Sequence, residues 1–211
     1  MADTYAGVAY WNGRYSGVDN SAPFDWYYPL EDLEPLLPVD SLPKDKEAEI
    51  LIPGCGTSGV GAKLAEMGYA NITCIDSSEV AIKKMKEQRG KWSKKVDYVF
   101  LDAAGLRNIP DGTFDFIFDK AFLDAAMCEE TAIDLVPQIL CELHRVLREG
   151  GRFLSLSHAV PSSRNALLHG TSLNWAAADP AAIRKPEVQG MRNYGADRNY
   201  YLYCCTKLGS D

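Results

Sequence analysis

Short apolar runs alternate with amphipathic stretches along most of the chain, as strands alternate with helices in an α/β protein. The first run, residues 49–52, is stopped by Gly54 and has the pattern of a strand buried on both faces. From Ser58 the apolar residues follow helical spacing until Gly68, where a helix is expected to end. The regular part of the chain therefore begins as a strand, a glycine turn and a helix.

The same alternation predicts further elements. Strands are expected at residues 71–75, 96–101, 114–118, 152–157 and 200–205, and helices at 30–37, 77–90 and 132–148. Pro137 favours a start of the last helix near that residue, and Gly150-Gly151 is expected to end it. Its inward stripe is predicted to be Ile133, Val136, Leu140, Leu143 and Leu147. One more strand is predicted near residues 173–177 or near residues 183–188.

Strands and helices at this spacing predict a doubly wound, largely parallel sheet with helices on both faces. The 211 residues of the chain suit a single domain, 1–211. Ligands of such sheets bind beyond the carboxyl ends of the strands, where the winding direction reverses. Gly54, Asp76, Asp102 and Asp119 all lie at predicted carboxyl ends. We therefore expect these four positions to share one site.

Composition changes this picture little. The chain is 46% hydrophobic and 24% charged, as in an ordinary soluble globular protein. A net charge of −7 argues against a nucleic-acid partner and favours a basic one. The lysines at 83, 84 and 86 are interpreted as the solvated face of a helix.

The cysteines indicate the cellular compartment of the protein, and the histidines indicate whether it binds a metal. The six cysteines form no Cys-x-x-Cys pair and fall mostly in apolar segments, which predicts reduced core thiols in an intracellular protein. Three histidines far apart in the sequence do not suggest zinc, and no metal is expected. The first residues lack the pattern of a signal peptide, and no apolar run nears the roughly 20 residues that cross a bilayer. We expect a cytoplasmic protein that does not enter membranes.

The first 27 residues are rich in aromatic side chains for a terminal arm. They are Tyr5, Tyr10, Trp11, Tyr15, Phe24, Trp26 and Tyr27. A solvated tail seldom carries so many large apolar groups, so residues 1–27 are predicted to pack against the rest of the protein.

The predicted strand ends carry groups that suit an adenosine. Asp76 can accept both ribose hydroxyls; the alternative is that it caps the following helix. Asp102 can accept the exocyclic amine of adenine while the Ala103 amide faces a ring nitrogen; the alternative is a turn cap. Asp119 and Lys120 follow the fourth strand, closest to the reacting group, although Lys120 could also be a surface lysine.

The glycine turn, Asp76, Asp102 and the turn at residues 147–153 (LREGGRF) resemble the class I S-adenosylmethionine methyltransferases. Five strings narrow the resemblance to the lysine methyltransferases of elongation factor 1-alpha, in the branch of lysine methyltransferase 4 and methyltransferase-like protein 13. They are residues 10–15 (YWNGRY), 21–26 (SAPFDW), 50–58 (ILIPGCGTS), 114–125 (FDFIFDKAFLDA) and 200–207 (YYLYCCTK). The resemblance covers about residues 8–160 and the last strand.

This resemblance implies a Rossmann-like sheet of seven strands with an antiparallel last strand. It implies that the arm folds over the methionine end of S-adenosylmethionine as a lid, and that 158–198 is a substrate-side insertion, of which 176–198 is longer than in the relatives. The implied product is S-adenosylhomocysteine. The implied cofactor contacts are Trp11, Tyr15, Trp26, Gly54, Asp76, Ser77, Asp102, Ala103 and Lys120.

Three functions stay open. The arm motifs and the acidic charge favour a monomeric protein-lysine methyltransferase acting on elongation factor 1-alpha or a similar protein. The alternatives are a small-molecule methyltransferase of the same fold and a non-catalytic cofactor-binding module. A lysine substrate must lose a proton before methyl transfer, and Asp119 and Asp124 are candidates for orienting it. The sequence identifies no general base.

Overall fold

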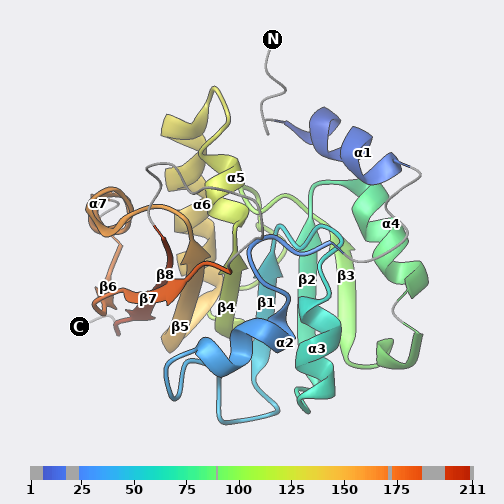
Figure 1. The fold of residues 1–211 in the computed structure, drawn as a ribbon, viewed down its shortest axis with the longest axis horizontal. Coiled ribbons are helices and arrows are strands. Elements are labelled where there is room, and N and C mark those ends of the chain that lie inside the picture. The colour runs from blue at the N-terminus through green and yellow to red at the C-terminus, as the bar shows by residue number, and fades with distance from the viewer. Residues whose placement is uncertain (1–6, 18–23, 89, 171–172, 187–197, 210–211) are drawn as a thin grey trace.

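One mixed sheet organises the chain (Figure 1). The computed structural model describes residues 7–17, 24–88, 90–170, 173–186 and 198–209. The strands are β1 (Glu49–Pro53), β2 (Asn71–Asp76), β3 (Val96–Phe100), β4 (Phe114–Lys120), β5 (Leu147–Ser157), β6 (Trp175–Ala177), β7 (Ala181–Arg184) and β8 (Asn199–Lys207). Those predicted at 71–75, 96–101, 114–118 and 200–205 are confirmed with small shifts at their ends.

The sheet order is β3-β2-β1-β4-β5-β8-β6, with β7 also paired to β8. The first five strands pair in parallel, and β8 runs antiparallel to β5. The chain winds outward from β1 to β3 and then returns to place β4 on the other side of β1. The direction of winding therefore reverses between β1 and β4, which is where this class of sheet opens a crevice.

The two alternatives for the remaining strand are both present. β6 pairs with residues 205–207 of β8 and β7 pairs with residues 199–202, along the same edge. The strand is interrupted around Pro180, which has no N–H to donate to the ladder. The eight strands thus occupy seven positions, and the predicted Rossmann-like fold class is confirmed. β7 ends at Arg184, and residues 187–197 of the predicted insertion lie outside the described residues.

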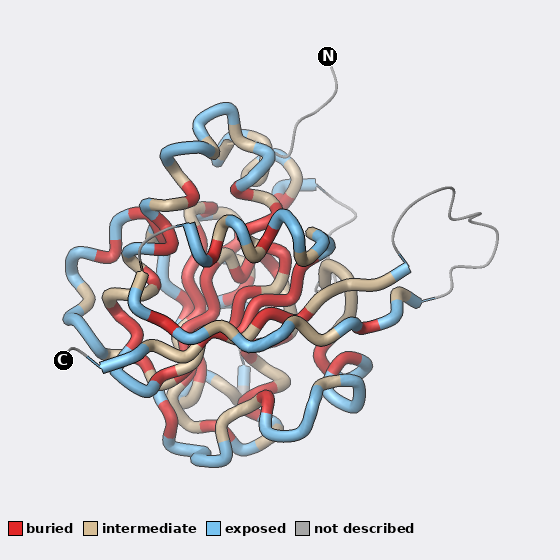
Figure 2. Tube along the Cα trace, turned by 90° about the vertical axis from the view of Figure 1, so that its left-hand side faces the viewer, coloured by how far each residue is buried: buried red, intermediate tan, exposed pale blue. Residues whose placement is uncertain are grey.

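The helices form two layers. They are α1 (Val8–Ser16), α2 (Leu30–Leu33), α3 (Val60–Glu66), α4 (Glu79–Gln88), α5 (Phe122–Ala126), α6 (Ala132–Val146) and α7 (Pro161–Gly170), with 3₁₀ turns at Glu34–Leu36 and Gly90–Trp92. Ile50 and Ile52 of β1 face a core shared with α2, α3 and α4, whereas Leu51 faces a core shared with α5, α6 and α7. Figure 2 shows the buried strands enclosed between these layers.

Three predictions about helices are wrong in detail. The α-helix expected at 30–37 changes to a 3₁₀ turn at Glu34, because Pro35 has no N–H for the α-helical ladder. α6 begins at Ala132, so Pro137 lies inside a continuous helix. Ile133 is 84% exposed and is not part of the buried stripe. The helices α5 and α7 were not predicted from the sequence.

The junction after α6 also differs from the prediction. The helix ends at Val146, and β5 starts directly at Leu147 instead of after Gly150-Gly151. Leu147 pairs with Phe114, and the next pair is Phe116 with Arg152. The two glycines therefore lie within an irregular part of β5 and do not end the helix.

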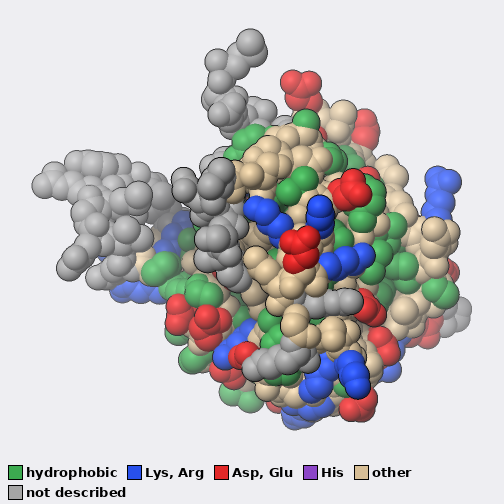
Figure 3. All heavy atoms as spheres, turned by 90° about the vertical axis from the view of Figure 1, so that its right-hand side faces the viewer, with side chains coloured by type: hydrophobic (Ala, Val, Ile, Leu, Met, Phe, Trp, Pro, Cys, Tyr) green, Lys and Arg blue, Asp and Glu red, His purple; other side chains and the backbone are tan. Residues whose placement is uncertain are grey.

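The face formed by α1, α4 and the edge strand β3 carries both signs of charge. Figure 3 shows basic and acidic side chains interspersed on it. Lys83 and Lys86 of α4 are exposed and Lys84 is half-buried, so the predicted solvated lysine face is confirmed.

The cysteines are all free thiols. The expectation of core thiols holds for Cys55, Cys74 and Cys205, whereas Cys128 and Cys141 are exposed. Within the described residues, no helix is both long and apolar enough to span a membrane.

The two sides of α6 give a stability test. Leu140 is fully buried and Ile133 is 84% exposed on the same helix. We expect Leu140→Ala to lower the free energy of unfolding by about 2–5 kcal/mol, because it leaves a cavity. Ile133→Ala should change it by no more than about 0.5 kcal/mol. Urea denaturation followed by circular dichroism measures both, and equal effects would contradict this packing of α6.

Candidate active site

A glycine turn joins β1 to α3 and closely approaches two other segments. Gly54 and Gly56 have φ values of 57° and 51°, a region that disfavours residues with a Cβ. A Cβ on Gly54 would lie 2.2 Å from the ring of Phe122, and one on Gly56 would lie 2.4 Å from the hydroxyl of Tyr15. Both positions therefore require glycine for space as well as for conformation.

Asp76, the last residue of β2, holds this turn from the neighbouring strand. Its Oδ2 accepts a hydrogen bond from the N–H of Gly56 and its Oδ1 one from the N–H of Ser78, both at 2.7 Å. Burial raises the pKa of Asp76 above its ordinary value, although both hydrogen bonds act to lower it. The Ser78 hydroxyl, and not Asp76, accepts the N–H of Ala81. Each Asp76 oxygen has a second lone pair for a ligand hydroxyl.

Asp102 and Ala103 follow β3, the next strand of the sheet. Asp102 Oδ1 accepts a hydrogen bond from the N–H of Ala104 at 2.9 Å, so the turn-capping alternative is also present. The Asp102 side chain is exposed and Ala103 is buried. A carboxylate next to a backbone amide matches the donor and acceptor edge of a purine, so this turn can cap itself and still recognise a base.

The aromatic arm closes over the turn. The Trp11 and Tyr15 rings of α1 stack with their centroids 5.8 Å apart, and the Trp26 ring meets Trp11 edge-on at 6.4 Å. Tyr15 is buried, and this burial raises the pKa of its hydroxyl. The arm thus packs against the domain as predicted from its composition, while residues 1–6 and 18–23 lie outside the described residues.

Asp25 was not predicted as a site residue, yet it anchors the arm. Its Oδ1 accepts a hydrogen bond from the Ser58 hydroxyl and lies 2.8 Å from Lys120 Nζ, while its Oδ2 accepts the N–H of Gly59 at 3.1 Å. Lys120 Nζ also donates to the Trp26 carbonyl at 2.7 Å. The two charged side chains are only 11% and 5% exposed. The alternative of a surface lysine is therefore wrong, and an acidic residue between two aromatics was the available signal.

One cavity gathers the predicted cofactor contacts. It lies beyond the carboxyl ends of β1, β2 and β4, at the switch in winding direction. Its lining includes all nine of them: Trp11, Tyr15, Trp26, Gly54, Asp76, Ser77, Asp102, Ala103 and Lys120. Leu101, Leu135 and Ile139 add apolar wall. The site thus combines a polar glycine turn, two carboxylates and an aromatic cover around one space.

Asp119 has a structural position that the sequence did not reveal. It is 1% exposed and is absent from the described lining of the cavity. Its Oδ1 accepts the N–H groups of Phe122 and Leu123, and its Oδ2 accepts the Ser155 hydroxyl at 2.6 Å. Burial raises the pKa of Asp119 to about 6. With both oxygens engaged below α5, Asp119 anchors that helix.

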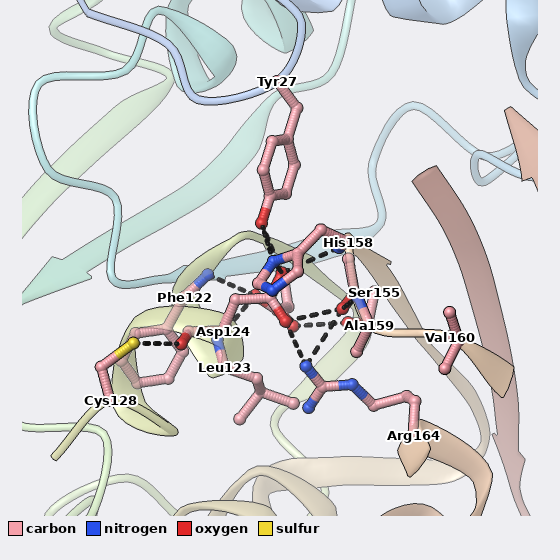
Figure 4. Close-up of polar contacts among 12 residues, drawn as sticks. Tyr27, Phe122, Leu123, Asp124, Cys128, Ser155, His158, Ala159, Val160 and Arg164 are labelled. Carbon is pink, nitrogen blue, oxygen red and sulfur yellow. Dashed lines mark hydrogen bonds and ion pairs between the residues drawn. The ribbon is translucent and has the colours of Figure 1, made fainter. Parts of the chain in front are cut away.

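Asp124 is the centre of a second polar cluster (Figure 4). The hydroxyls of Tyr27 and Ser157 donate to it at 2.5 and 2.6 Å, the N–H of His158 donates at 3.1 Å, and Arg164 forms a buried ion pair with it. Burial acts to raise the pKa of Asp124, but the His158 hydrogen bond and the Arg164 charge outweigh it and hold the pKa below its usual range. Asp124 is therefore an ionised anchor that joins α5 to Tyr27, to the end of β5 and to α7.

Comparisons with known proteins agree with this geometry. A family model described as a methyltransferase domain matches residues 51–155. The chain is 36% identical over 157 residues to the eEF1A lysine and N-terminal methyltransferase of Mus musculus, covering 74% of this chain and 22% of the relative. It is 32% identical over 168 residues to EEF1A lysine methyltransferase 4 of Mus musculus, covering 76% of this chain and 64% of the relative.

A solved structure shows the same fold. The 1,6-didemethyltoxoflavin-N1-methyltransferase of Burkholderia thailandensis, crystallised with S-adenosylhomocysteine, superposes with a TM-score of 0.58 at 18% identity, covering 77% of this chain and 72% of that one. At this identity the likeness concerns the fold alone.

The sheet order, the glycine turn and the cavity at the switch point define a Rossmann-like domain, and residues 51–155 of it match the methyltransferase domain model. Within that class the chain is similar to the eEF1A lysine methyltransferases, which confirms the resemblance carried by its motifs. The matched region spans less than two thirds of either relative.

The Asp25–Lys120 ion pair predicts a specific pattern of stabilities. Asp25→Asn and Lys120→Met should each lower the free energy of unfolding by about 3–5 kcal/mol, because each leaves one buried charge unpaired. The double variant should lose clearly less than the sum of the two. Urea denaturation of the four proteins gives the coupling energy, and simple additivity would contradict a direct interaction.

Asp119 predicts a pH dependence of stability. Its pKa is about 6 in the folded protein against a reference of 3.8, so folding favours the protonated form. Asp119 contributes its full share to the free energy of unfolding below about pH 4. That contribution, on the order of 3 kcal/mol, is lost as the pH rises through about 6. Asp119→Asn should abolish that loss, whereas the exposed control Asp134→Asn should retain it. Unfolding free energies at pH 4, 5, 6 and 7 measure the difference; parallel curves would refute the assignment.

Proposed function

We propose that the chain is an S-adenosylmethionine-dependent protein-lysine methyltransferase that acts on eEF1A or a similar protein. The observation that carries this proposal is the cavity at the switch point, whose lining includes all nine predicted cofactor contacts. The similarity to proteins named as eEF1A lysine methyltransferases supports the choice of substrate.

The residues around the cavity fit the adenosine part of the cofactor. Gly54 and Gly56 keep the turn free of side chains, so that a ligand can approach the backbone. The buried Asp76 carboxylate would accept the ribose hydroxyls, with Ser77 beside it. Asp102 and the Ala103 amide would pair with the adenine edge.

The arm fits the other end of the cofactor. Trp11, Tyr15 and Trp26 form an aromatic cover over the cavity, and Lys120 holds the Trp26 segment to the end of β4. S-adenosylmethionine supplies a methyl group on a positively charged sulfur and leaves as S-adenosylhomocysteine. The chain would align the acceptor with that methyl group and exclude water, which are the main contributions an enzyme makes to such a displacement.

The proposal also covers the charge of the substrate, the oligomeric state and the location of the protein. A net charge of −7 suits a basic protein substrate, whose approach it would accelerate. The proposal includes a monomer in the cytoplasm that binds neither nucleic acid nor membranes. A salt-sensitive association rate with purified eEF1A would support the electrostatic part of it.

We expect the purified protein, radiolabelled S-adenosylmethionine and a cell extract to give one labelled protein band near the size of eEF1A. Asp76→Ala should remove most of that label, because it deletes a buried carboxylate that receives the ribose. Losing hydrogen bonds to a charged group, worth about 1.5–3 kcal/mol, should weaken cofactor binding roughly 10- to 150-fold. Calorimetric titration measures the affinity.

Asp134→Asn, an exposed change on α6 away from the cavity, serves as the matched control and should keep wild-type labelling. Label confined to small molecules would replace the proposal by a small-molecule methyltransferase. Intact cofactor binding without transfer to any acceptor would leave a non-catalytic cofactor-binding module.

A further inference from the structure

His158 is not part of the described cavity lining and was not among the predicted site residues, but it directly follows the strand that pairs with β4. It follows Ser157, the last residue of β5. β5 runs beside β4, and the N–H of Ala121 donates to the Leu156 carbonyl at 3.1 Å. Lys120 and Ala121 line the cavity. Leu156, two residues before His158, is therefore hydrogen-bonded to a residue of the cavity lining. The side chain is 59% exposed and is accessible from solvent.

The contacts of the His158 ring fix its tautomer (Figure 4). The Tyr27 hydroxyl lies 2.5 Å from Asp124 Oδ2 and 2.9 Å from His158 Nδ1, and Nδ1 lies 3.2 Å from Asp124 Oδ2. A tyrosine hydroxyl has one hydrogen, and the ionised carboxylate can only accept. The hydroxyl therefore donates to Asp124, and Nδ1 must carry the hydrogen that it shares with Tyr27 and Asp124. In the neutral ring the lone pair is then on Nε2.

We propose that His158 accepts the proton of the substrate ammonium through Nε2, with Tyr27 and Asp124 as its positioning residues. This inference rests on the proposed lysine methylation and adds the proton acceptor that the sequence did not identify. An ionised carboxylate behind Nδ1 is the arrangement that holds an imidazole in one tautomer and stabilises its protonated form.

A proton acceptor answers a specific need of an amine substrate. With a pKa of about 10.4, only about one lysine side chain in a thousand is neutral near pH 7.4. The N–H bond of the ammonium breaks toward Nε2 and leaves its electron pair on nitrogen. That pair forms the new N–C bond, the electron pair of the C–S bond stays on sulfur, and the imidazolium later returns its proton to water.

The charged groups around His158 favour this role. Its hydrogen bond to Asp124 raises the pKa of His158, while burial and the nearby charges of Arg164 and Lys185 act to lower it. The net effect is a pKa above the ordinary value. Tyr27 faces the ring as a neutral group, because burial raises the pKa of its hydroxyl as well. The imidazole therefore holds a proton more firmly than a free histidine would.

The neighbouring aromatic rings suit the stem and the charge of a lysine. The Tyr27 and Tyr200 rings lie 4.3 Å apart at 30°, and the His158 ring lies 6.3 Å from that of Tyr27. Lys185 Nζ lies 5.1 Å from the centre of the Tyr200 ring, so this ring already faces an ammonium in the present structure. Such faces attract cations while covering apolar methylenes.

The decisive measurement is the rate of methyl transfer to purified eEF1A between pH 6 and 10. We compare the wild type with His158→Asn, whose amide can still donate to Asp124, and with His169→Asn, an exposed control on α7. The wild-type rate should level off above the pKa of His158. His158→Asn should be about 100-fold slower near pH 7.5 and should recover toward pH 10, where the lysine ionises unaided. His169→Asn should match the wild type.

A second readout does not depend on activity. Nitrogen NMR of the unmodified protein, assigned with His158→Asn, should show the Nδ1–H tautomer and a pKa above 6.5 for His158. An Nε2–H tautomer, or a pKa for His158 that is not above 6.5, would overturn the inference.

The outcomes also separate this inference from the function on which it rests. Methyl transfer by the wild type with an unchanged rate and pH profile in His158→Asn would refute the role of His158 alone. A loss in His158→Asn that is equal at every pH would reveal a structural effect and would refute it too. Absence of transfer by the wild type would refute the proposed function, and the role of His158 with it.

Discussion

The carboxylate of Asp25, whose side chain is 11% exposed, couples three parts of the chain that are far apart in sequence. It accepts hydrogen bonds from the glycine turn at Ser58 and Gly59, and it forms an ion pair with Lys120 at the end of β4. A charged pair with so little exposure is tolerated only when its polar partners are all in place. The arm, the turn and the end of β4 therefore form one cooperative unit. The cavity depends on that unit, because each of its three parts supplies a wall.

Two carboxylates anchor the short helix α5 in opposite electrostatic states. Asp119 has only neutral donors as direct partners, so burial prevails and its pKa rises to about 6. Asp124 has Arg164 and a set of donors around it, and it stays ionised despite being buried. One carboxylate thus serves the fold, and the other also holds a tyrosine and the histidine that follows β5. Their proximity in sequence gave no sign of this division.

The positions of most strands and their burial could be predicted because parallel strands covered on both faces leave long apolar runs, whereas their order in the sheet came only from the structure. The parts of the structure that were predicted wrongly or incompletely have no such apolar run. Ile133 fits the helical stripe by spacing, yet α6 extends past the layer it packs on and leaves this residue in water. β6 and β7 are too short for a periodic pattern and exist because both pair with β8.

The sequence by itself determined that Gly54, Asp76 and Asp102 meet, because parallel strands bring their carboxyl ends to one edge and the local pattern marks where each strand stops. Only the tertiary structure decided what the remaining polar groups do. Asp25 and His158 obtain their partners across many residues of sequence and between separate elements. Such contacts follow no local period, since they arise from packing that no short stretch of the chain encodes.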